Sequence, residues 1–300
     1  MSDRSRARLG IPTLALALAG CASGGTGIAA GAGAVVSGDT GVEGLDATLW
    51  MQHAAEYGAS TEQAYRIASE MLAAALEDSS WTAAPEQRSD ASALPPAIIL
   101  DVDETVLDNS PFQARLIIEG REFNPQMWGE WIDQAAAAPV PGALAFALQA
   151  AAQGVMVFYV TNRDANMESS TRRNLERHEF PLAPGEDVIL TRGEHEGWGS
   201  DKSSRRAYVA ARYRVLLVVG DDLNDFVTVT RSSAEERDQI ATDHAAFWGR
   251  KWIILPNPTY GSWERALYGF DSSLSPEEKR RRKAENLNAG AGSDDEGLRD

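Results

Sequence analysis

The chain has 300 residues, of which 43% are hydrophobic and 24% are charged, and its formal net charge at pH 7 is −16. These fractions are ordinary for a globular protein, and they exclude a chain that is disordered throughout or one that crosses a membrane many times. The negative charge repels phosphate backbones, so nucleic acid is not an expected partner. An anionic substrate would have to be attracted by a local cation, either a metal ion or a few Lys and Arg side chains.

The N-terminal residues have the pattern of an export signal. Three arginines precede an apolar run over residues 9–19, which is too short for a transmembrane helix because such a helix needs about 20 apolar residues. We therefore predict that residues 1–20 are a signal peptide. Cys21 follows Leu18-Ala19-Gly20, and this sequence resembles a bacterial lipobox, in which the cysteine is lipidated. The alternative is a chance cysteine beside an ordinary cleavage site.

Both ends of the chain are predicted to lie outside the folded domain. Residues 21–44 are mostly small and are expected to form a flexible tether, because they can bury little apolar surface. Ala22 follows the cysteine, which in a Gram-negative cell predicts placement of the lipid-anchored protein in the outer membrane of the bacterial envelope. Residues 271–300 are predicted to be a disordered charged tail, because acidic residues flank their basic run. The folded domain is expected at residues 45–270.

Short apolar runs alternate with helical patterns within this domain. An amphipathic helix is expected to begin at the capping-box sequence Ser60-Thr61-Glu62-Gln63. Further helices are expected between Pro141 and Gly154, and over residues 167–178 and 203–213. Apolar runs that end in polar residues predict buried parallel strands at residues 97–100, 155–160, 188–190, 215–219 and 252–255.

This alternation predicts an α/β fold, in which a doubly wound, Rossmann-like parallel sheet has helices on both faces. Residues 110–138 interrupt the alternation directly after the first strand. Together with the N-terminal helices of residues 45–95, they are expected to form a small, mainly helical cap. This cap would cover the edge of the sheet at which the strands end.

Polar side chains follow the predicted strands at this edge. Asp101-Val102-Asp103-Glu104-Thr105 follow the first strand, Thr161-Asn162-Arg163 the second, and Gly220-Asp221-Asp222-Leu223-Asn224-Asp225 the fourth. Lys202 precedes the helix that leads into that fourth strand. Because ligands bind beyond the carboxyl ends of parallel strands, these side chains are expected to meet. The carboxylates would repel one another without a bound cation, and their hard oxygen atoms indicate Mg²⁺.

The segment from Asp101 to Ser110, DVDETVLDNS, resembles the first motif of the haloacid dehalogenase (HAD) superfamily, and more narrowly that of the class C acid phosphatases typified by the lipoprotein e 5′-nucleotidases. The narrower resemblance also rests on residues 50–57, residues 160–163, Gly220-Asp221 with Asp225, and residues 255–264. It implies a HAD-like fold and an acid phosphatase that acts on phosphomonoesters. Asp222 departs from the pattern, in which Asn is expected, and would add charge beside the metal.

Charge and position, read with this resemblance, imply a role for each polar residue. Asp101 would be the nucleophile that forms an aspartyl phosphate. Asp103 would protonate the leaving oxygen and later deprotonate water, which argues against a dehalogenase or a P-type ATPase. Thr161, with the backbone of Asn162, would hydrogen-bond the phosphoryl oxygens, and Lys202 would neutralise them while keeping Asp101 ionised. The expected Mg²⁺ ligands are the carboxylates of Asp101, Asp221 and Asp225 and the backbone carbonyl of Asp103.

The resemblance also implies that Trp128 and Tyr260 clasp a nucleobase, although large aromatic side chains more often pack in a core. The expected substrates are nucleoside monophosphates, including nicotinamide mononucleotide. A broad-specificity acid phosphatase, a phosphotransferase and a binding lipoprotein on the same fold remain alternatives. No spacing suggests a ligand or catalytic role for Asp108, Asp164, Asp222 or the histidines, which are expected to be structural or surface residues.

Overall fold

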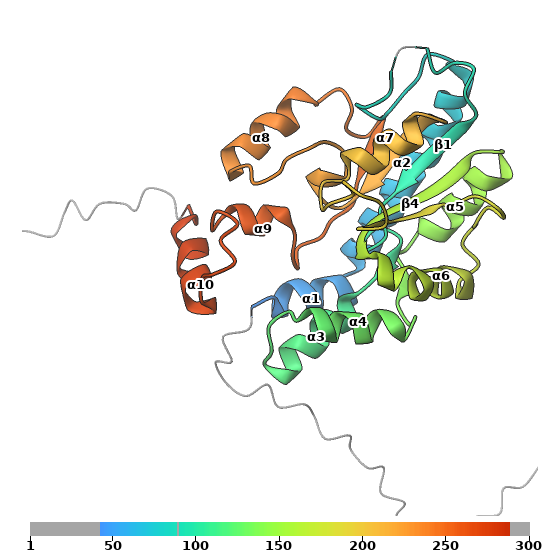
Figure 1. Ribbon diagram of the computed structural model, residues 1–300. Coiled ribbons are helices and arrows are strands. Elements are labelled where there is room, and N and C mark those ends of the chain that lie inside the picture. The colour runs from blue at the N-terminus through green and yellow to red at the C-terminus, as the bar shows by residue number, and fades with distance from the viewer. Residues whose placement is uncertain (1–42, 89, 289–300) are drawn as a thin grey trace, which may run out of the picture. The chain divides into compact units, whose positions relative to one another are not determined.

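The computed structural model describes residues 43–88 and 90–288 (Figure 1). The predicted signal peptide, Cys21 and most of the predicted tether lie outside these described residues. Among the helices that the structure describes, none has the length and apolar character that crossing a membrane requires.

A five-stranded parallel sheet lies at the centre of the described domain. Its order is β5-β4-β1-β6-β7, so the first strand lies in the middle. The five predicted strands are confirmed as β1 (Pro96–Leu100), β4 (Met156–Asp164), β5 (Ile189–Arg192), β6 (Arg214–Gly220) and β7 (Trp252–Ile254). All residues of β6 are buried, and since successive side chains of a strand point to opposite faces, both faces of the sheet are covered. The predicted α/β architecture is therefore confirmed.

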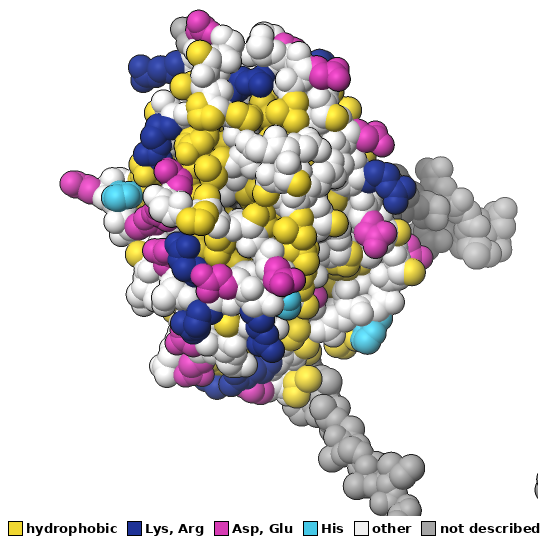
Figure 2. Space-filling view, turned by 90° about the vertical axis from the view of Figure 1, so that its right-hand side faces the viewer, with side chains coloured by type: hydrophobic (Ala, Val, Ile, Leu, Met, Phe, Trp, Pro, Cys, Tyr) yellow, Lys and Arg dark blue, Asp and Glu magenta, His cyan; other side chains and the backbone are white. Residues whose placement is uncertain are grey.

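Four helices pack around this sheet. α2 (Ala55–Glu77) contacts α5 (Ala143–Ala152), β6 and β7, whereas α7 (Ser203–Ala210) contacts β4 and β6, and α6 (Glu168–Arg177) contacts β5. α2 and α5 approach closely at Gly142, where a Cβ atom would lie 3.0 Å from the Tyr65 side chain. On the right-hand side of Figure 1, where α5 and α6 lie, Figure 2 shows hydrophobic side chains surrounded by charged groups of both signs. The negative net charge is thus not concentrated on that face.

The start of α2 and its place in the fold differ from the predictions. α2 begins at Ala55, so the capping-box prediction at Ser60 is wrong, and the Ser60 hydroxyl donates to the Tyr57 carbonyl within the helix. α2 also packs in the main core instead of the cap, because its buried face of Tyr65, Ala68 and Leu72 lies against the apolar residues of the sheet. Small side chains on this face permit the close approach.

The cap is correspondingly smaller than predicted. It consists of α1 (Leu45–His53), α3 (Ser110–Glu119) and α4 (Pro125–Asp133), which lie together at the bottom of Figure 1. Phe112, Leu116 and Met127 form a separate apolar cluster within it. The antiparallel strands β2 (Leu107–Asp108) and β3 (Ala138–Pro139) pair at the two ends of the inserted segment and close it.

The part of the chain after β6 contains α8 (Ala234–Asp243), α9 (Ser262–Ala266) and α10 (Pro276–Glu285). Residues 271–300 were predicted to be disordered, and this prediction is wrong for residues 276–285, which form α10. The Ser275 side chain caps α10, and Glu278 forms ion pairs with Arg281 and Arg282 one turn later. Lys283 also pairs with Glu264 at 2.6 Å and connects α10 to α9. Capping and charge pairing therefore form this helix without a buried apolar face.

Candidate active site

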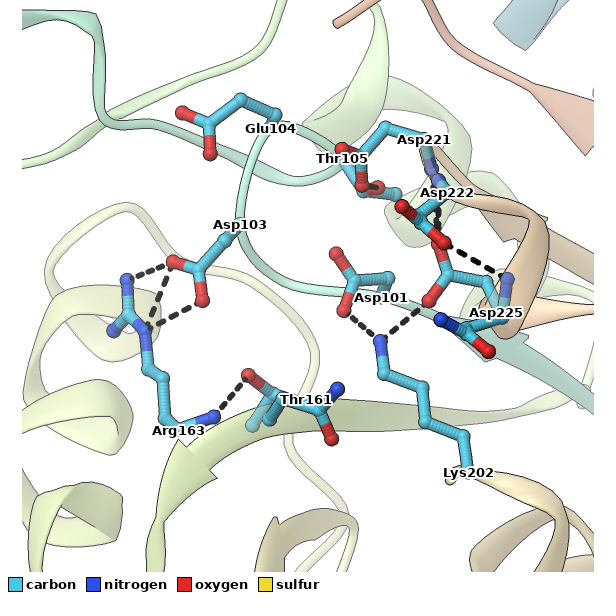
Figure 3. A network of polar contacts seen from close by, with 12 residues as sticks. Asp101, Asp103, Glu104, Thr105, Thr161, Arg163, Lys202, Asp221, Asp222 and Asp225 are labelled. Carbon is cyan, nitrogen blue, oxygen red and sulfur yellow. Dashed lines mark hydrogen bonds and ion pairs between the residues drawn. The ribbon is translucent and has the colours of Figure 1, made fainter. Parts of the chain in front are cut away.

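The polar residues that follow β1 and β6, and those in the last part of β4, meet at one edge of the sheet (Figure 3). Leu100, the last residue of β1, pairs with Tyr159 of β4 and Val219 of β6, so the residues that come next after these three positions start from the same level of the sheet. Asp101 directly follows β1, and Thr161 lies two residues beyond Tyr159 within β4, which continues to Asp164. The sheet register therefore produces the convergence that the sequence predicts.

Asp101, Asp221 and Asp225 form a carboxylate cluster. Each offers an oxygen, and these oxygens lie within 4.8 Å of one another. Lys202 Nζ donates to Asp101 Oδ1 and, at 2.6 Å, to Asp225 Oδ1. Asp101, Asp225 and Lys202 are each less than 10% exposed, so water screens these charges little. The four residues form a compact ionic centre.

Burial makes the negative charges of this centre costly. Burial raises the pKa of Asp101 to about 7, although Lys202 acts in the opposite direction. Burial, followed by the nearby carboxylates of Asp101 and Asp225, raises the pKa of Asp221 well above its ordinary value. One lysine contacts two of these three carboxylates, so a further cation fits the charge balance of the site. The ligand atoms that the three aspartates offer are all carboxylate oxygens, which suit a hard divalent ion.

The loop after β6 holds two of the three carboxylates. Asp225 lies in the short helix η2 (Leu223–Asp225), and its Oδ2 accepts from the backbone N–H groups of Asp221 and Asp222 at 3.1 and 2.9 Å. A Cβ atom on Gly220 would lie 2.2 Å from this same oxygen. A glycine at the end of β6 is therefore required for Asp225 to fold back onto the loop.

The extra charge of Asp222 is directed away from this cluster. Its carboxylate accepts from the backbone N–H of Ser262 at 2.6 Å and of Asn224 at 2.9 Å, and Arg237 lies 3.9 Å away. Asp222 thus connects the loop after β6 to the start of α9.

α7 carries three buried cations that bind different parts of the site. Lys202, the N-cap residue of α7, contacts the carboxylates, and Arg205 donates to the Thr161 carbonyl and to Asn162 Oδ1. Arg206 donates to the carbonyl of Asp225 at 3.1 Å. These residues are spaced i, i+3 and i+4, so one face of α7 presents them all. Arg205 and Arg206 are absent from the sequence prediction, although their spacing from Lys202 was a usable signal.

Thr161 and Asn162 lie beside the ionic centre. Thr161 is fully buried, and its Oγ1 accepts from the backbone N–H of Arg163 at 3.1 Å, which leaves the hydroxyl proton able to donate. The Asn162 side chain accepts from Arg205 and donates to the Ser200 carbonyl, so it connects the last part of β4 to the segment before α7.

Asp103 lies on the same loop as Asp101 but has different partners. Its Oδ1 accepts from Arg163 Nη2 at 2.7 Å and from Asn109 Nδ2 at 2.9 Å. The Arg163 side chain is only 1% exposed, so this ion pair is largely shielded from solvent. Figure 3 shows Asp103 turned toward Arg163, whereas Asp101 is turned toward Lys202. The two carboxylates are therefore held in separate environments, Asp101 by Lys202 and Asp103 by Arg163 and Asn109.

Trp128 and Tyr260 come from opposite parts of the chain and have different surroundings. Trp128, on α4, packs edge-on against Phe112 with ring centroids 5.0 Å apart, and the Arg163 guanidinium lies 5.8 Å from its ring. Tyr260, in the loop after β7, donates its hydroxyl to the fully buried Glu104. Trp128 therefore contacts Arg163, the ion-pair partner of Asp103, and Tyr260 contacts Glu104, which follows Asp103 in the chain. Among the described ring contacts, the two aromatic side chains do not touch each other.

The polar residues expected to be structural have local partners. Asp108 accepts from the backbone N–H of Ser110 at the start of α3, and Asp164 pairs with Arg192 at 2.8 Å. His178 bonds to the Ala137 carbonyl at 2.9 Å. These contacts tie neighbouring segments together and lie outside the ionic centre.

Comparison with known proteins finds one matching family model and similar solved structures. A family model described as HAD superfamily, subfamily IIIB (Acid phosphatase), matches residues 40–263. Two solved structures of the class C acid phosphatase from Bacillus anthracis, one of them with tungstate bound, are each 37% identical to this chain. Each match covers 82% of this chain and 97% of that protein, with a TM-score of 0.73.

Proposed function

Because the chain belongs to the acid phosphatases of HAD subfamily IIIB, and is therefore a phosphoric monoester hydrolase, we propose that it forms an aspartyl-phosphate intermediate on Asp101. The observation that carries this proposal is the buried contact between the Asp101 carboxylate and Lys202 at the end of the central strand. The ammonium group favours the ionised carboxylate, and a carboxylate is the form that can attack phosphorus.

In the first step an Asp101 oxygen bonds to phosphorus while the bond from phosphorus to the leaving oxygen breaks. The electron pair of that bond goes to the leaving oxygen, which takes a proton from Asp103. In the second step the Asp103 carboxylate removes a proton from water, and the resulting oxygen nucleophile attacks phosphorus. Asp101 is then released as a carboxylate and inorganic phosphate departs. One residue thus serves as acid and then as base.

Thr161 and Lys202 are proposed to bind the phosphoryl oxygens, together with the backbone of Asn162. Lys202 contacts Asp101 directly, and Figure 3 shows the Thr161 side chain in the same part of the site, where negative charge builds up during transfer. The Bacillus anthracis relative has been solved with tungstate bound, and because tungstate, like phosphate, is a tetrahedral oxyanion, this supports the binding of a phosphoryl group by the present protein.

The cation of this site is proposed to be Mg²⁺. The carboxylates of Asp101, Asp221 and Asp225, with the backbone carbonyl of Asp103, would hold it, and the all-oxygen donor set of the cluster fits this ion. When bound, it would neutralise the carboxylates and stabilise charge on the phosphoryl oxygens.

The substrates are proposed to be nucleoside monophosphates, including nicotinamide mononucleotide. Since the ionic centre can contact only the phosphoryl group, selectivity has to come from residues that touch the leaving group. Trp128 and Tyr260 are large, only partly buried, and attached through Arg163 and Glu104 to the loop of Asp103. These rings are therefore the aromatic surfaces proposed to stack with the base.

Trp128→Ala is expected to raise the Michaelis constant for a nucleoside monophosphate by roughly 10- to 100-fold, because stacking a base on an aromatic ring contributes about 1–3 kcal/mol. The constant for glycerol phosphate, which has no base, should change little. Steady-state kinetics on both substrates test this prediction. Equal losses on the two would mean that Trp128 only packs with Phe112 in the cap, and the nucleotide preference would be rejected.

We also propose that the protein is anchored in the bacterial envelope by lipid on Cys21, with the outer membrane as its location in a Gram-negative cell. The lipobox-like sequence before Cys21 and the small residues after it support this proposal. Cys21→Ser should incorporate no labelled fatty acid in expressing cells and should lose its membrane association. Equal labelling of the variant and the wild type would refute lipid attachment at this residue.

A further inference from the structure

Asn109 connects the cap to the Asp103 carboxylate. It precedes α3 and is fully buried. Its Oδ1 accepts a hydrogen bond from Trp131 Nε1 of α4 at 2.8 Å, and its Nδ2 donates to Asp103 Oδ1 at 2.9 Å. A single amide side chain thus lies between the cap helix and the residue proposed to protonate the leaving group.

Trp131 determines which way this amide points. An indole N–H can donate a hydrogen bond but cannot accept one, so the amide oxygen must face Trp131. The amide nitrogen then faces Asp103. The backbone N–H of Asn109 also donates to Glu104 Oε1 at 2.8 Å, which fixes the main chain of the residue. Asn109 is therefore held both in position and in orientation.

Arg163 holds the same carboxylate from another side. Its Nη2 and Nε lie 2.7 and 3.0 Å from Asp103 Oδ1, and its Nη1 donates to Thr171 of α6 at 3.0 Å. Among the described contacts, Oδ1 receives three N–H donors, whereas Oδ2 receives one long contact from Arg163 Nε at 3.3 Å. The carboxylate is thus fixed through Oδ1, and Oδ2 is the oxygen left to face a substrate.

We propose that Trp131 and Asn109 are positioning residues for Asp103, so that the cap aligns the group that protonates the leaving oxygen. This inference rests on the proposed function, since it takes Asp103 as the proton donor. α4 also carries Trp128, the residue proposed to contact the leaving group. Trp128, which would contact the leaving group, and Trp131, which supports the proton donor, therefore lie on one helix, three residues apart in sequence.

The test uses the chemistry of the leaving group. An alkoxide such as that of glycerol is strongly basic and needs a proton as it departs, whereas p-nitrophenolate is stable without one. Misalignment of Asp103 should therefore slow the hydrolysis of glycerol phosphate more than that of p-nitrophenyl phosphate. The ratio kcat/KM reports only the steps up to departure of the leaving group, so the later role of Asp103 as a base does not enter.

Trp131→Phe removes the indole N–H and keeps an aromatic ring. Its kcat/KM for glycerol phosphate should fall by about tenfold or more, while that for p-nitrophenyl phosphate should fall by less than about twofold, because a small misplacement of a catalytic group is costly where that group acts. Asn109→Asp, which preserves the shape but replaces the donor to Asp103 by an acceptor, should show the same selectivity with a larger loss. It serves as the test if the Trp131 variant does not fold.

Trp248→Phe is the matched control. Its indole N–H also makes one hydrogen bond, to the Ala241 carbonyl at 2.9 Å, but among the described contacts it touches no residue around Asp103. Both substrates should be turned over normally by this variant. Thermal unfolding of all the variants checks that they are folded.

Asp103→Asn separates failure of this inference from failure of the proposed function. If it lowers kcat/KM equally for both substrates, Asp103 is not the acid and the proposed function is wrong on this point. If it is selective for glycerol phosphate but folded Trp131→Phe and Asn109→Asp are not, the positioning inference is overturned. Selective losses in all three variants support both.

Discussion

Asp101→Asn is expected to lower turnover of any phosphomonoester by roughly 10⁴-fold or more, the scale seen when a catalytic nucleophile is removed. An amide cannot attack phosphorus to form the acyl phosphate, so the first bond-forming step is lost. The protein should remain folded, because Lys202 keeps its 2.6 Å contact with Asp225. Phosphate release under saturating substrate measures turnover, and circular dichroism measures the fold.

Asp164→Asn provides a control of the same chemical change at the end of the neighbouring strand. Its side chain is 47% exposed and pairs with Arg192 outside the ionic centre, so activity should be preserved. A folded Asp101→Asn enzyme that retained activity would refute the nucleophile assignment, whatever the control showed.

Removing the divalent cation is expected to abolish activity, and added Mg²⁺ should restore it. The carboxylates of Asp101, Asp221 and Asp225 would then repel one another, and among the described ion pairs Lys202 contacts Asp101 and Asp225 but not Asp221. Mg²⁺ should also raise the unfolding temperature, because an ion that binds the folded state stabilises it by about 2.7 kcal/mol at 100 times its dissociation constant. Activity and thermal unfolding after dialysis against a chelator measure the two effects.

Asp221→Asn should weaken both effects of Mg²⁺, whereas Asp222→Asn should leave the response to Mg²⁺ unchanged, because Asp222 is bonded to Ser262 and Asn224 and lies outside the carboxylate cluster. Full activity of the wild type in excess chelator would rule out the metal requirement.

The strands and the acidic residues of the site were predictable from sequence for a physical reason. A strand covered on both faces is apolar at nearly every position, as in β6, and the first polar residues after it mark the edge of the sheet. Asp101 and Asp221 each follow such a run directly. Because parallel strands end at one edge, their proximity followed from the sequence without any knowledge of distances.

The residues that support the site were not predictable in the same way. Arg163, Arg205 and Arg206 are fully buried, yet charged residues are usually exposed, and apart from the spacing of the last two from Lys202, α7 shows no clear apolar pattern that would mark its buried face. Asn109 and Glu104 lie within the recognised motif, but their partners Trp131 and Tyr260 are distant in sequence. Long-range hydrogen bonds of this kind are specified by the fold and leave no local pattern.

The ion pairs of Lys202 at the start of α7 affect the order in which the protein folds. Asp101, Thr161 and Asp225 lie far apart in the chain and meet only after β1, β4 and β6 have paired. Until Lys202 reaches them, bringing Asp101 and Asp225 together is opposed by their charges and by loss of hydration. We therefore expect the catalytic centre to assemble together with the docking of α7 onto the sheet. Partly folded chains without this docked helix would then have neither the complete sheet packing nor catalytic activity.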